Sequence, residues 1–150
     1  MIMIEHDFEK SFMLWVRLAS HLFSVSFNNE LSGTGITLRQ AQVLYCLESR
    51  GELAQNELAT QLQIEPPTIA RILDRMERDG WIKRLPSPQD RRKKIIHPTK
   101  KVESVWKSII KCGRRIEKQA TANLSHSQLD AAKEVLKVVS KNLGFEKGQV

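Results

Sequence analysis

The chain has 150 residues, of which 41% are hydrophobic and 27% are charged, and its formal net charge at pH 7 is +7. These proportions are typical of one soluble globular domain, and no apolar run approaches the roughly 18 residues that a membrane helix needs. The excess of positive charge indicates an anionic partner, with nucleic acid as the first candidate and a membrane surface as the second. No secretory signal is expected, because the first four residues run straight into Glu5, and the two distant cysteines favour a cytoplasmic location.

The first predicted element is a long helix from Glu5 to about Leu31. So many large apolar side chains are more than a small domain needs on one helix for its own core, and we expect this helix to pack against a second subunit. The chain then breaks into a loop at 32–35, which contains two glycines. The apolar side chains that recur with a helical period are Phe8, Phe12, Trp15, Leu18, Ala19, Leu22 and Val25.

Three helices are predicted after this loop. The pattern Thr37-x-x-Gln40 is a capping box, so a helix should begin there and end near Gly51. A short extended link leads to the next helix, over about 55–63, and a tight turn leads into the third. Short helices joined by a tight turn are typical of a helix-turn-helix, whose last helix lies in a groove of DNA.

The third of these helices carries an arginine stripe. Pro66 and Pro67 suit its first turn, where a missing N–H costs nothing, and Gly80 fits its C-cap. Arginine pairs bidentately with guanine or with a phosphate, so this helix is the predicted recognition helix. Its apolar face comprises Ile69, Ile72, Leu73 and Met76, and its polar face comprises Thr68, Arg71, Arg75 and Arg78.

A basic β-hairpin is predicted next, with strands at 81–85 and 94–97. The loop at 86–93 is too polar and too rich in proline to be the interior of a strand. The segment 65–101 carries a net charge of +6 out of the chain's +7. So concentrated a cationic surface attracts polyanions through counterion release, although a charge run is more often an ordinary solvated face.

Two further helices complete the chain. The first is predicted over about 99–122. Ser125-x-x-Gln128 is a second capping box, and the helix that it starts should run through Leu143. Each helix has an apolar stripe. The stripe of the first helix comprises Val102, Val105, Trp106, Ile109, Ile110, Gly113 and Ile116. The stripe of the second helix comprises Leu129, Ala132, Val135, Leu136, Val139 and Leu143.

These segments together resemble the MarR/SlyA family of bacterial winged-helix transcription regulators over nearly the full length of the chain. The resemblance rests on 38–44, 55–59 and 71–77 and, above all, on the Asp-Arg-Arg-Lys-Lys sequence at 90–94 between two strands. The segments 64–67 and 99–103 are most similar to the SlyA branch.

The fold that the resemblance implies is mainly α with a small β-wing, in one domain that spans 1–150. Its parts are an N-terminal dimerisation helix at 1–31, a winged helix-turn-helix at 36–99, C-terminal dimerisation helices at 100–143 and a tail at 144–150. The implied activity is sequence-specific binding of double-stranded DNA by a homodimer, at a pseudo-palindromic operator, with the two recognition helices one DNA turn apart.

The resemblance also implies individual contacts with DNA. Arg71 matches the recognition-helix arginine, Arg91 matches the wing arginine that enters the minor groove, and Asp90 matches the carboxylate that orients it. The chain departs from common patterns at Gln63, where many helix-turn-helix sequences have a turn glycine, and at Val102, where many family members have glycine. The other residues predicted to contact DNA are Pro67, Thr68, Arg75, Arg92, Lys93 and Lys94.

Two kinds of regulation are compatible with the sequence. In the first, a small aromatic or phenolic effector binds in a pocket lined by Trp15, His21 and Trp106 and causes release of the DNA, although core packing is the commoner role of a tryptophan. The second kind of regulation is oxidant sensing through Cys46 or Cys112. Such sensing needs an exposed thiol of lowered pKa.

Several classes of protein are not expected. The sequence has no catalytic constellation, no phosphate-binding glycine loop and no metal-ligand spacing, so we expect no enzyme, no cofactor and no metal. The main alternative is a nonspecific, nucleoid-type DNA-binding protein. It would show the same salt dependence as a regulator but little preference for one site.

Overall fold

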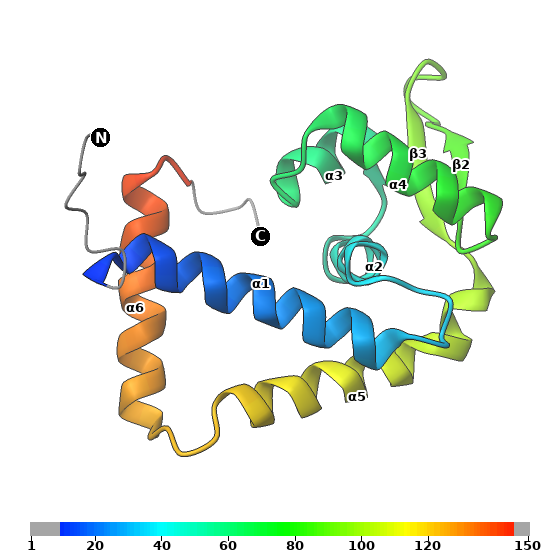
Figure 1. Ribbon diagram of the computed structural model, residues 1–150. Helices are drawn as coiled ribbons and strands as arrows, with labels where there is room; N and C mark the ends of the chain where they lie inside the picture. The colour runs from blue at the N-terminus through cyan, green and yellow to red at the C-terminus, as the bar shows by residue number, and fades with distance from the viewer. Residues whose placement is uncertain (1–9, 146–150) are drawn as a thin grey trace, which may run out of the picture.

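The computed structural model describes residues 10–145 (Figure 1). Long helices form one part of the molecule, and a small helical domain with a three-stranded sheet forms the other. This arrangement confirms the predicted fold class, which is mainly α with a small β-wing. The elements in chain order are α1 (Phe12–Leu31), α2 (Leu38–Arg50), β1 (Leu53–Ala54), α3 (Gln55–Gln61), α4 (Pro66–Arg78), β2 (Ile82–Pro86), β3 (Lys94–Pro98), the 3-10 turn η2 (Lys100–Val102), α5 (Glu103–Ala120) and α6 (His126–Asn142).

Both predicted capping boxes are confirmed. The Thr37 hydroxyl accepts a hydrogen bond from the Gln40 N–H at 3.3 Å, and the Gln40 side chain accepts one from the Thr37 N–H at 2.9 Å. Ser125 and Gln128 make the same reciprocal pair at 3.2 and 2.8 Å. Each pair satisfies two backbone donors that the first turn of a helix would otherwise leave without a partner.

The N-terminal helix begins later than predicted. Ser11 lies outside α1 and caps it, because its hydroxyl accepts a hydrogen bond from the Leu14 N–H. The predicted start at Glu5 lies outside the described residues. A similar shift occurs at α5, where a 3-10 turn over Lys100–Val102 replaces the predicted first α-helical turn.

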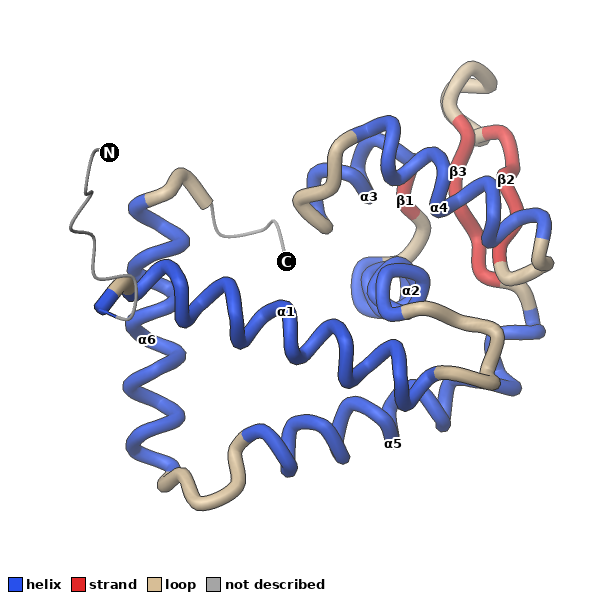
Figure 2. The backbone as a smooth tube through the Cα atoms, in the orientation of Figure 1, coloured by secondary structure: helices blue, strands red, loops and turns tan. Residues whose placement is uncertain are grey.

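The sheet contains one strand more than predicted. Its order is β1-β3-β2, and all pairs are antiparallel (Figure 2). The segment 53–54, expected to be only an extended link, forms β1, in which Leu53 pairs with Ile96. A strand of two residues is too short to show the alternation of apolar and polar side chains by which a strand is recognised in a sequence. The added strand anchors the hairpin to the helix-turn-helix.

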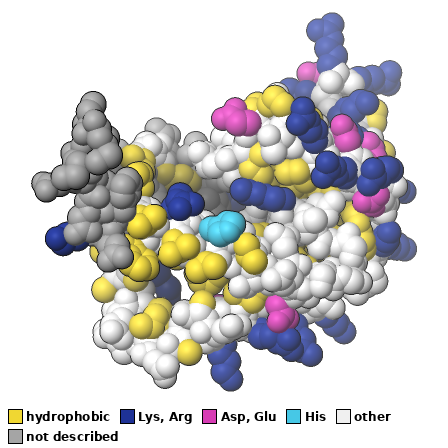
Figure 3. All heavy atoms as spheres, in the orientation of Figure 1, with side chains coloured by type: hydrophobic (Ala, Val, Ile, Leu, Met, Phe, Trp, Pro, Cys, Tyr) yellow, Lys and Arg dark blue, Asp and Glu magenta, His cyan; other side chains and the backbone are white. Residues whose placement is uncertain are grey.

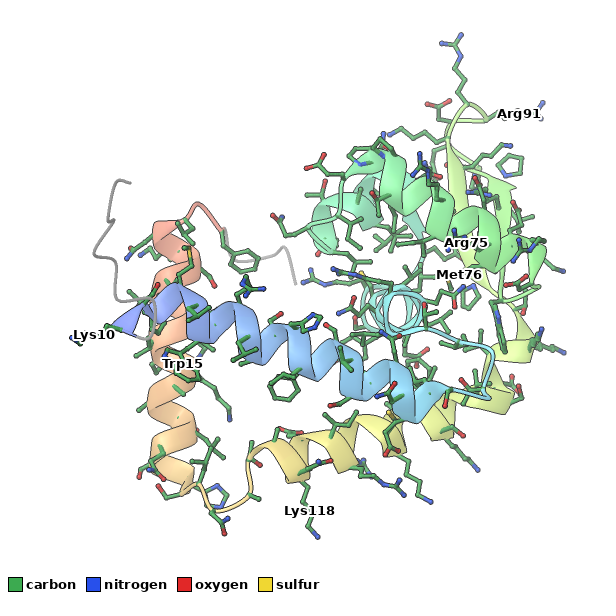
Figure 4. The ribbon with its side chains drawn as sticks, in the orientation of Figure 1. Lys10, Trp15, Arg75, Met76, Arg91 and Lys118 are labelled. Atoms are coloured by element: carbon green, nitrogen blue, oxygen red, sulfur yellow. The ribbon has the colours of Figure 1, made fainter. Side chains whose placement is uncertain are left out.

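The core of the winged domain lies between α2, α3, α4 and the sheet. On α4, the predicted apolar residues Ile69, Leu73 and Met76 are fully buried, whereas Ile72 is only half-buried. Met76 lies between α4 and α2 (Figure 4). With one face of α4 fixed in this core, its other face is held at the surface.

The helices outside the winged domain leave much apolar surface exposed. α1 packs antiparallel against α5, where Phe27 approaches Gly113 and Glu30 forms an ion pair with Arg115 at 2.9 Å. α6 crosses α1 and has no buried residue (Figure 1). Hydrophobic side chains gather over this part of the molecule (Figure 3). The exposed ones on α1 and α6 include Phe12, Trp15, Val16, Leu22, Phe23, Val25, Val135, Leu136 and Val138. Within residues 10–145, no helix has the length and apolar content needed to cross a membrane.

Candidate nucleic-acid interface

The polar face of α4 is exposed along its length. Thr68, Arg71 and Arg75 all point away from the core, on the face opposite Leu73. Pro66 and Pro67 occupy its first turn, as predicted, so no N–H is lost from the helix ladder. The result is a short helix whose long cationic side chains are available to base edges and phosphates.

The turn into α4 has a left-handed residue at Gln63, the position where the chain departs from the common turn glycine. Gln63 has a φ of 50°, in the left-handed region that glycine adopts without cost. Its side-chain amide donates to the Thr60 carbonyl at 3.0 Å, and the next residue, Ile64, donates its N–H to the Ala59 carbonyl at 3.0 Å. These bonds hold the angle between α3 and α4.

The tip of the wing is a hydrogen-bonded turn with arginines at its two corners. The Lys93 N–H donates to the Asp90 carbonyl at 2.9 Å, which closes a four-residue β-turn. The Asp90 carboxylate accepts the Arg92 N–H at 3.0 Å, as aspartate at the first position of a turn commonly does. Arg91 and Arg92 are therefore held at the corners, with exposed side chains.

Asp90 does not orient Arg91 by pairing with its guanidinium. Among the described residues, no ion pair joins the two side chains, and the recorded contact of the carboxylate is with the backbone of Arg92. The buried Ser87 hydroxyl supports the same loop, because it accepts the N–H groups of Gln89 and Asp90. The aspartate therefore sets the direction of the arginines through the backbone.

The predicted contact residues lie on two connected elements. Arg75 lies on α4, and Arg91 lies at the wing tip beyond the ends of β2 and β3 (Figure 4). Lysine and arginine side chains gather over this part of the molecule (Figure 3). All nine residues predicted to contact DNA are exposed, namely Pro67, Thr68, Arg71, Arg75, Asp90, Arg91, Arg92, Lys93 and Lys94.

The junction between α4 and β2 is fixed by side chains from beyond the wing. The Lys101 ammonium donates to the Asp79 carbonyl at 2.7 Å and lies 4.2 Å from the centre of the Trp81 ring. The Thr99 hydroxyl donates to the Gly80 carbonyl at 2.7 Å. Both satisfy carbonyls at the C-terminal end of α4, which a helix otherwise leaves without partners.

One cation of the basic segment, Arg84, has a role that its sequence did not reveal. Arg84 on β2 is largely buried and forms ion pairs with Asp74 and Glu77 of α4, each at 2.6 Å. A signal for this was present, because the two-residue period of a strand places Arg84 on the same face as Ile82. Asp74 and Glu77 are three residues apart and so share one face of their helix.

Neither cysteine has the features of an oxidant sensor. Cys46 and Cys112 are both buried, at 7% and 5% relative exposure. Burial raises the pKa of the Cys46 thiol. Burial and the nearby Glu30 carboxylate raise the pKa of the Cys112 thiol. A sensing thiol needs exposure and a lowered pKa, so the structure opposes the redox alternative.

The three residues of the predicted effector pocket do not line a common hollow in one protomer. Trp15 faces a hollow between α1 and α6, Trp106 lines a hollow where α2 meets η2 and α5, and His21 is exposed on α1. α1 and α5 run antiparallel, so Trp15 and Trp106 lie towards opposite ends of this pair of helices.

A different hollow, of about 830 Å³, lies beside the recognition helix, between α4 and the α1–α2 loop. Thr68, Ile72 and Arg75 of α4 form one wall, and the α1–α2 loop and the start of α2, with Arg39, form the other. No group of three or more acidic, histidine or cysteine side chains is arranged to hold a metal in the described part of the chain.

Comparisons with known proteins match this chain to a family model and to transcriptional regulators. The family model described as "MarR family" matches residues 36–94. An uncharacterised HTH-type transcriptional regulator of Bacillus subtilis, YwoH, is 32% identical over 94 residues, which cover 63% of this chain and 68% of that protein.

Two solved structures match over most of their length. A cysteine-to-serine mutant of E. coli MarR complexed with operator DNA superposes with a TM-score of 0.78 at 25% identity, covering 83% of this chain and 90% of that one. BpsR of Bordetella bronchiseptica, whose DNA binding is regulated by 6-hydroxynicotinic acid, has a TM-score of 0.82 at 18% identity and covers 90% and 96%. The second likeness bears on the fold alone.

Proposed function

Because this chain belongs to the MarR family of DNA-binding transcriptional regulators, we propose that it binds a pseudo-palindromic operator as a homodimer. The observation that carries the proposal is the pairing of an exposed arginine face on α4 with an arginine turn at the wing tip. In each protomer, Arg71 and Arg75 read the major groove while Arg91 enters the adjacent minor groove, whose negative potential favours arginine.

The apolar faces of α1 and α6 support the dimer. A helix of 17 residues that buries none of them in its own protomer needs a partner for its apolar stripe. We expect Leu136→Asp to shift the protein to monomers in sedimentation velocity, because a charge would enter the buried interface. Tyr45→Asp, a matched apolar-to-charged change at an exposed position of α2 outside the predicted dimerisation helices, should leave the dimer intact. A dimeric Leu136→Asp variant would contradict this assignment of the interface.

The proposal is tested by selecting duplexes from a random library and measuring their affinity by fluorescence anisotropy. A regulator should enrich an inverted repeat whose half-sites lie one DNA turn apart. Its affinity for that repeat should exceed its affinity for a scrambled duplex by roughly a thousandfold or more, at each of two salt concentrations. Equal, salt-sensitive binding to both duplexes would instead favour the nonspecific DNA-packing protein.

Release by a small aromatic anion is the second part of the proposal. The hollow beside α4 is lined by Arg39 and Arg75 from two different elements, so an aromatic carboxylate there would take Thr68 and Arg75 away from DNA. Benzoate and 6-hydroxynicotinate are suitable probes. Either should weaken operator binding, and Arg39→Ala should remove that response while leaving operator affinity close to that of the native protein. Unchanged affinity with both probes at millimolar concentration would contradict this part alone.

A further inference from the structure

Arg84 is surrounded by groups of its own chain. Its side chain is only 14% exposed, and its two terminal nitrogens lie 2.6 Å from an oxygen of Asp74 and of Glu77. Burial alone would lower the pKa of Arg84, but the hydrogen bonds that its guanidinium donates to the two carboxylates raise the pKa above its ordinary value. A DNA phosphate would have to displace two carboxylates that are already in contact. Arg84 is therefore unsuited to a direct contact with DNA.

The backbone of Arg84 is tied to the same helix. β2 is an edge strand of the sheet, so some of its N–H groups have no strand partner. The Glu77 carboxylate accepts the Arg84 N–H at 3.2 Å through the oxygen that does not bind the guanidinium. Gln55 at the start of α3 lies 3.5 Å from the guanidinium and adds a weaker contact. One residue of β2 is thus held to α4 by its backbone and its side chain together.

Arg84 lies at the base of the projecting part of the hairpin, so a small rotation of the strand at Arg84 causes a larger displacement of the wing tip. Leu85 and Pro86, the next residues of β2, are exposed, so the strand leaves the body of the domain at this point. Arg91 follows Arg84 by seven residues, but β2 ends at Pro86 and the tip is a turn. The arm is therefore shorter than the roughly 23 Å of a fully extended segment, on the order of 16 Å. A rotation of roughly 10° about its base would move the tip by about 3 Å, which is enough to break a hydrogen bond.

We propose that Arg84 is a positioning residue, which holds the wing at a fixed angle to the recognition helix so that Arg91 and Arg71 reach their grooves together. This inference rests on the proposed DNA-binding function and adds to it a device internal to each protomer. The ion pairs with Asp74 and Glu77 make α4 and the hairpin one rigid unit. Without them, the recognition helix still enters its groove, but the wing arginine no longer meets its target.

A double-mutant cycle on the selected operator tests the inference. In the native background, Arg91→Ala should weaken binding of the dimer at least about thirtyfold. In an Arg84→Met background, where the wing is loose, Arg91→Ala should change affinity less than twofold. Arg71→Ala should cost the same factor in both backgrounds, because α4 stays in its core. Equal factors for Arg91→Ala in both backgrounds would overturn the inference, since residues that act independently have additive effects.

Two further variants separate positioning from loss of charge. Arg78→Met also removes an arginine and an ion pair, with Asp79 at 2.9 Å, but this pair does not reach the wing. Arg91→Ala should therefore weaken operator binding by the same factor in the Arg78→Met background as in the native background. Compared with Arg84→Met, Arg84→Lys should restore part of the contribution of Arg91 to binding. A lysine ammonium can pair with one carboxylate but cannot hold two at once with the fixed geometry of a guanidinium. If the effect of Arg91→Ala on affinity were lost in the Arg78→Met background as well as in the Arg84→Met background, the inference would also be overturned.

A measurement without DNA keeps this inference distinct from the proposed function. In the native protein, the residual dipolar couplings of backbone N–H groups in α4 and in the β2–β3 hairpin should fit one alignment tensor. In Arg84→Met the hairpin couplings should shrink while those of α4 are unchanged. Unchanged hairpin couplings would overturn the inference even if operator binding is confirmed. Failure of the native protein to prefer any operator would refute only the proposed function.

Discussion

Replacing Arg91 by alanine is the sharpest test of the wing. The turn that carries Arg91 is closed by the backbone of Asp90 and Lys93 and by the carboxylate of Asp90, none of which involves the Arg91 side chain. That side chain is exposed, with no recorded ion pair among the described residues. We therefore expect Arg91→Ala to leave the melting temperature unchanged and to act on DNA binding alone.

The expected loss follows from the number of contacts. A specific arginine contact with DNA contributes about 1–3 kcal/mol, and a homodimer on a palindromic operator has two such wings, so the dimer should lose about 2–6 kcal/mol. The salt dependence should also become shallower. If each Arg91 neutralises one phosphate charge, the slope of log K against log salt should fall in magnitude by about 1.8 for the dimer.

Fluorescence anisotropy on the selected operator at four or five salt concentrations measures both quantities. Lys118→Ala is the matched control, because Lys118 is also an exposed cation but lies on α5, far from the wing (Figure 4). The control should keep its affinity and its slope within a factor of about two. If Arg91→Ala behaves like Lys118→Ala, the wing does not contact DNA, and the geometric argument built on the Asp90 turn is wrong.

Three other predictions concern the fold and its thiols. Thr37→Ala removes half of the capping box of α2 and should cost about 0.5–2 kcal/mol in urea unfolding, whereas an unchanged midpoint would show that the box contributes nothing. Gln63→Gly should be neutral or stabilising, because φ at this position is 50°, but Gln63→Val should cost about 1–2 kcal/mol. The reverse order in thermal unfolding would contradict the strain argument. Burial raises the pKa of Cys46 and Cys112, so iodoacetamide at pH 8 should label both far faster in urea than in the folded protein. Rapid labelling of either thiol in the folded protein, seen by mass spectrometry, would reopen the oxidant-sensing alternative.

The features that the sequence predicted well are those in which a short pattern has one physical solution. Thr37 with Gln40 has the spacing of a capping box, and few other arrangements satisfy the same backbone donors. Ile69, Leu73 and Met76 define one face of α4 wherever that helix packs. The left-handed φ of Gln63 agrees with its position, where many helix-turn-helix sequences have a turn glycine, but that expectation came from the resemblance and not from a local pattern.

The features that the sequence missed depend on contacts between distant segments. β1 exists only because 53–54 meet β3, some forty residues later in the chain. The role of Asp90 in the turn backbone, rather than in an ion pair, depends on how the loop closes onto Ser87. Trp15, His21 and Trp106 were predicted to line one effector pocket, but the antiparallel packing of α1 and α5 places Trp15 and Trp106 at separate hollows.

Arg84 shows why a charge count alone does not locate a DNA-binding surface. The net charge of +6 in 65–101 treats every arginine as available, yet Arg84 is held by Asp74 and Glu77, and Arg78 is paired with Asp79. The two pairs differ, because the Arg84 side chain is only 14% exposed whereas the Arg78 side chain is 72% exposed and stays at the surface. The cations that geometry leaves available to a phosphate or a base are therefore those on the exposed face of α4 and at the wing tip. In the proposal made above, Asp74 and Glu77, the acidic residues of α4, contribute to DNA binding by fixing the direction of the wing.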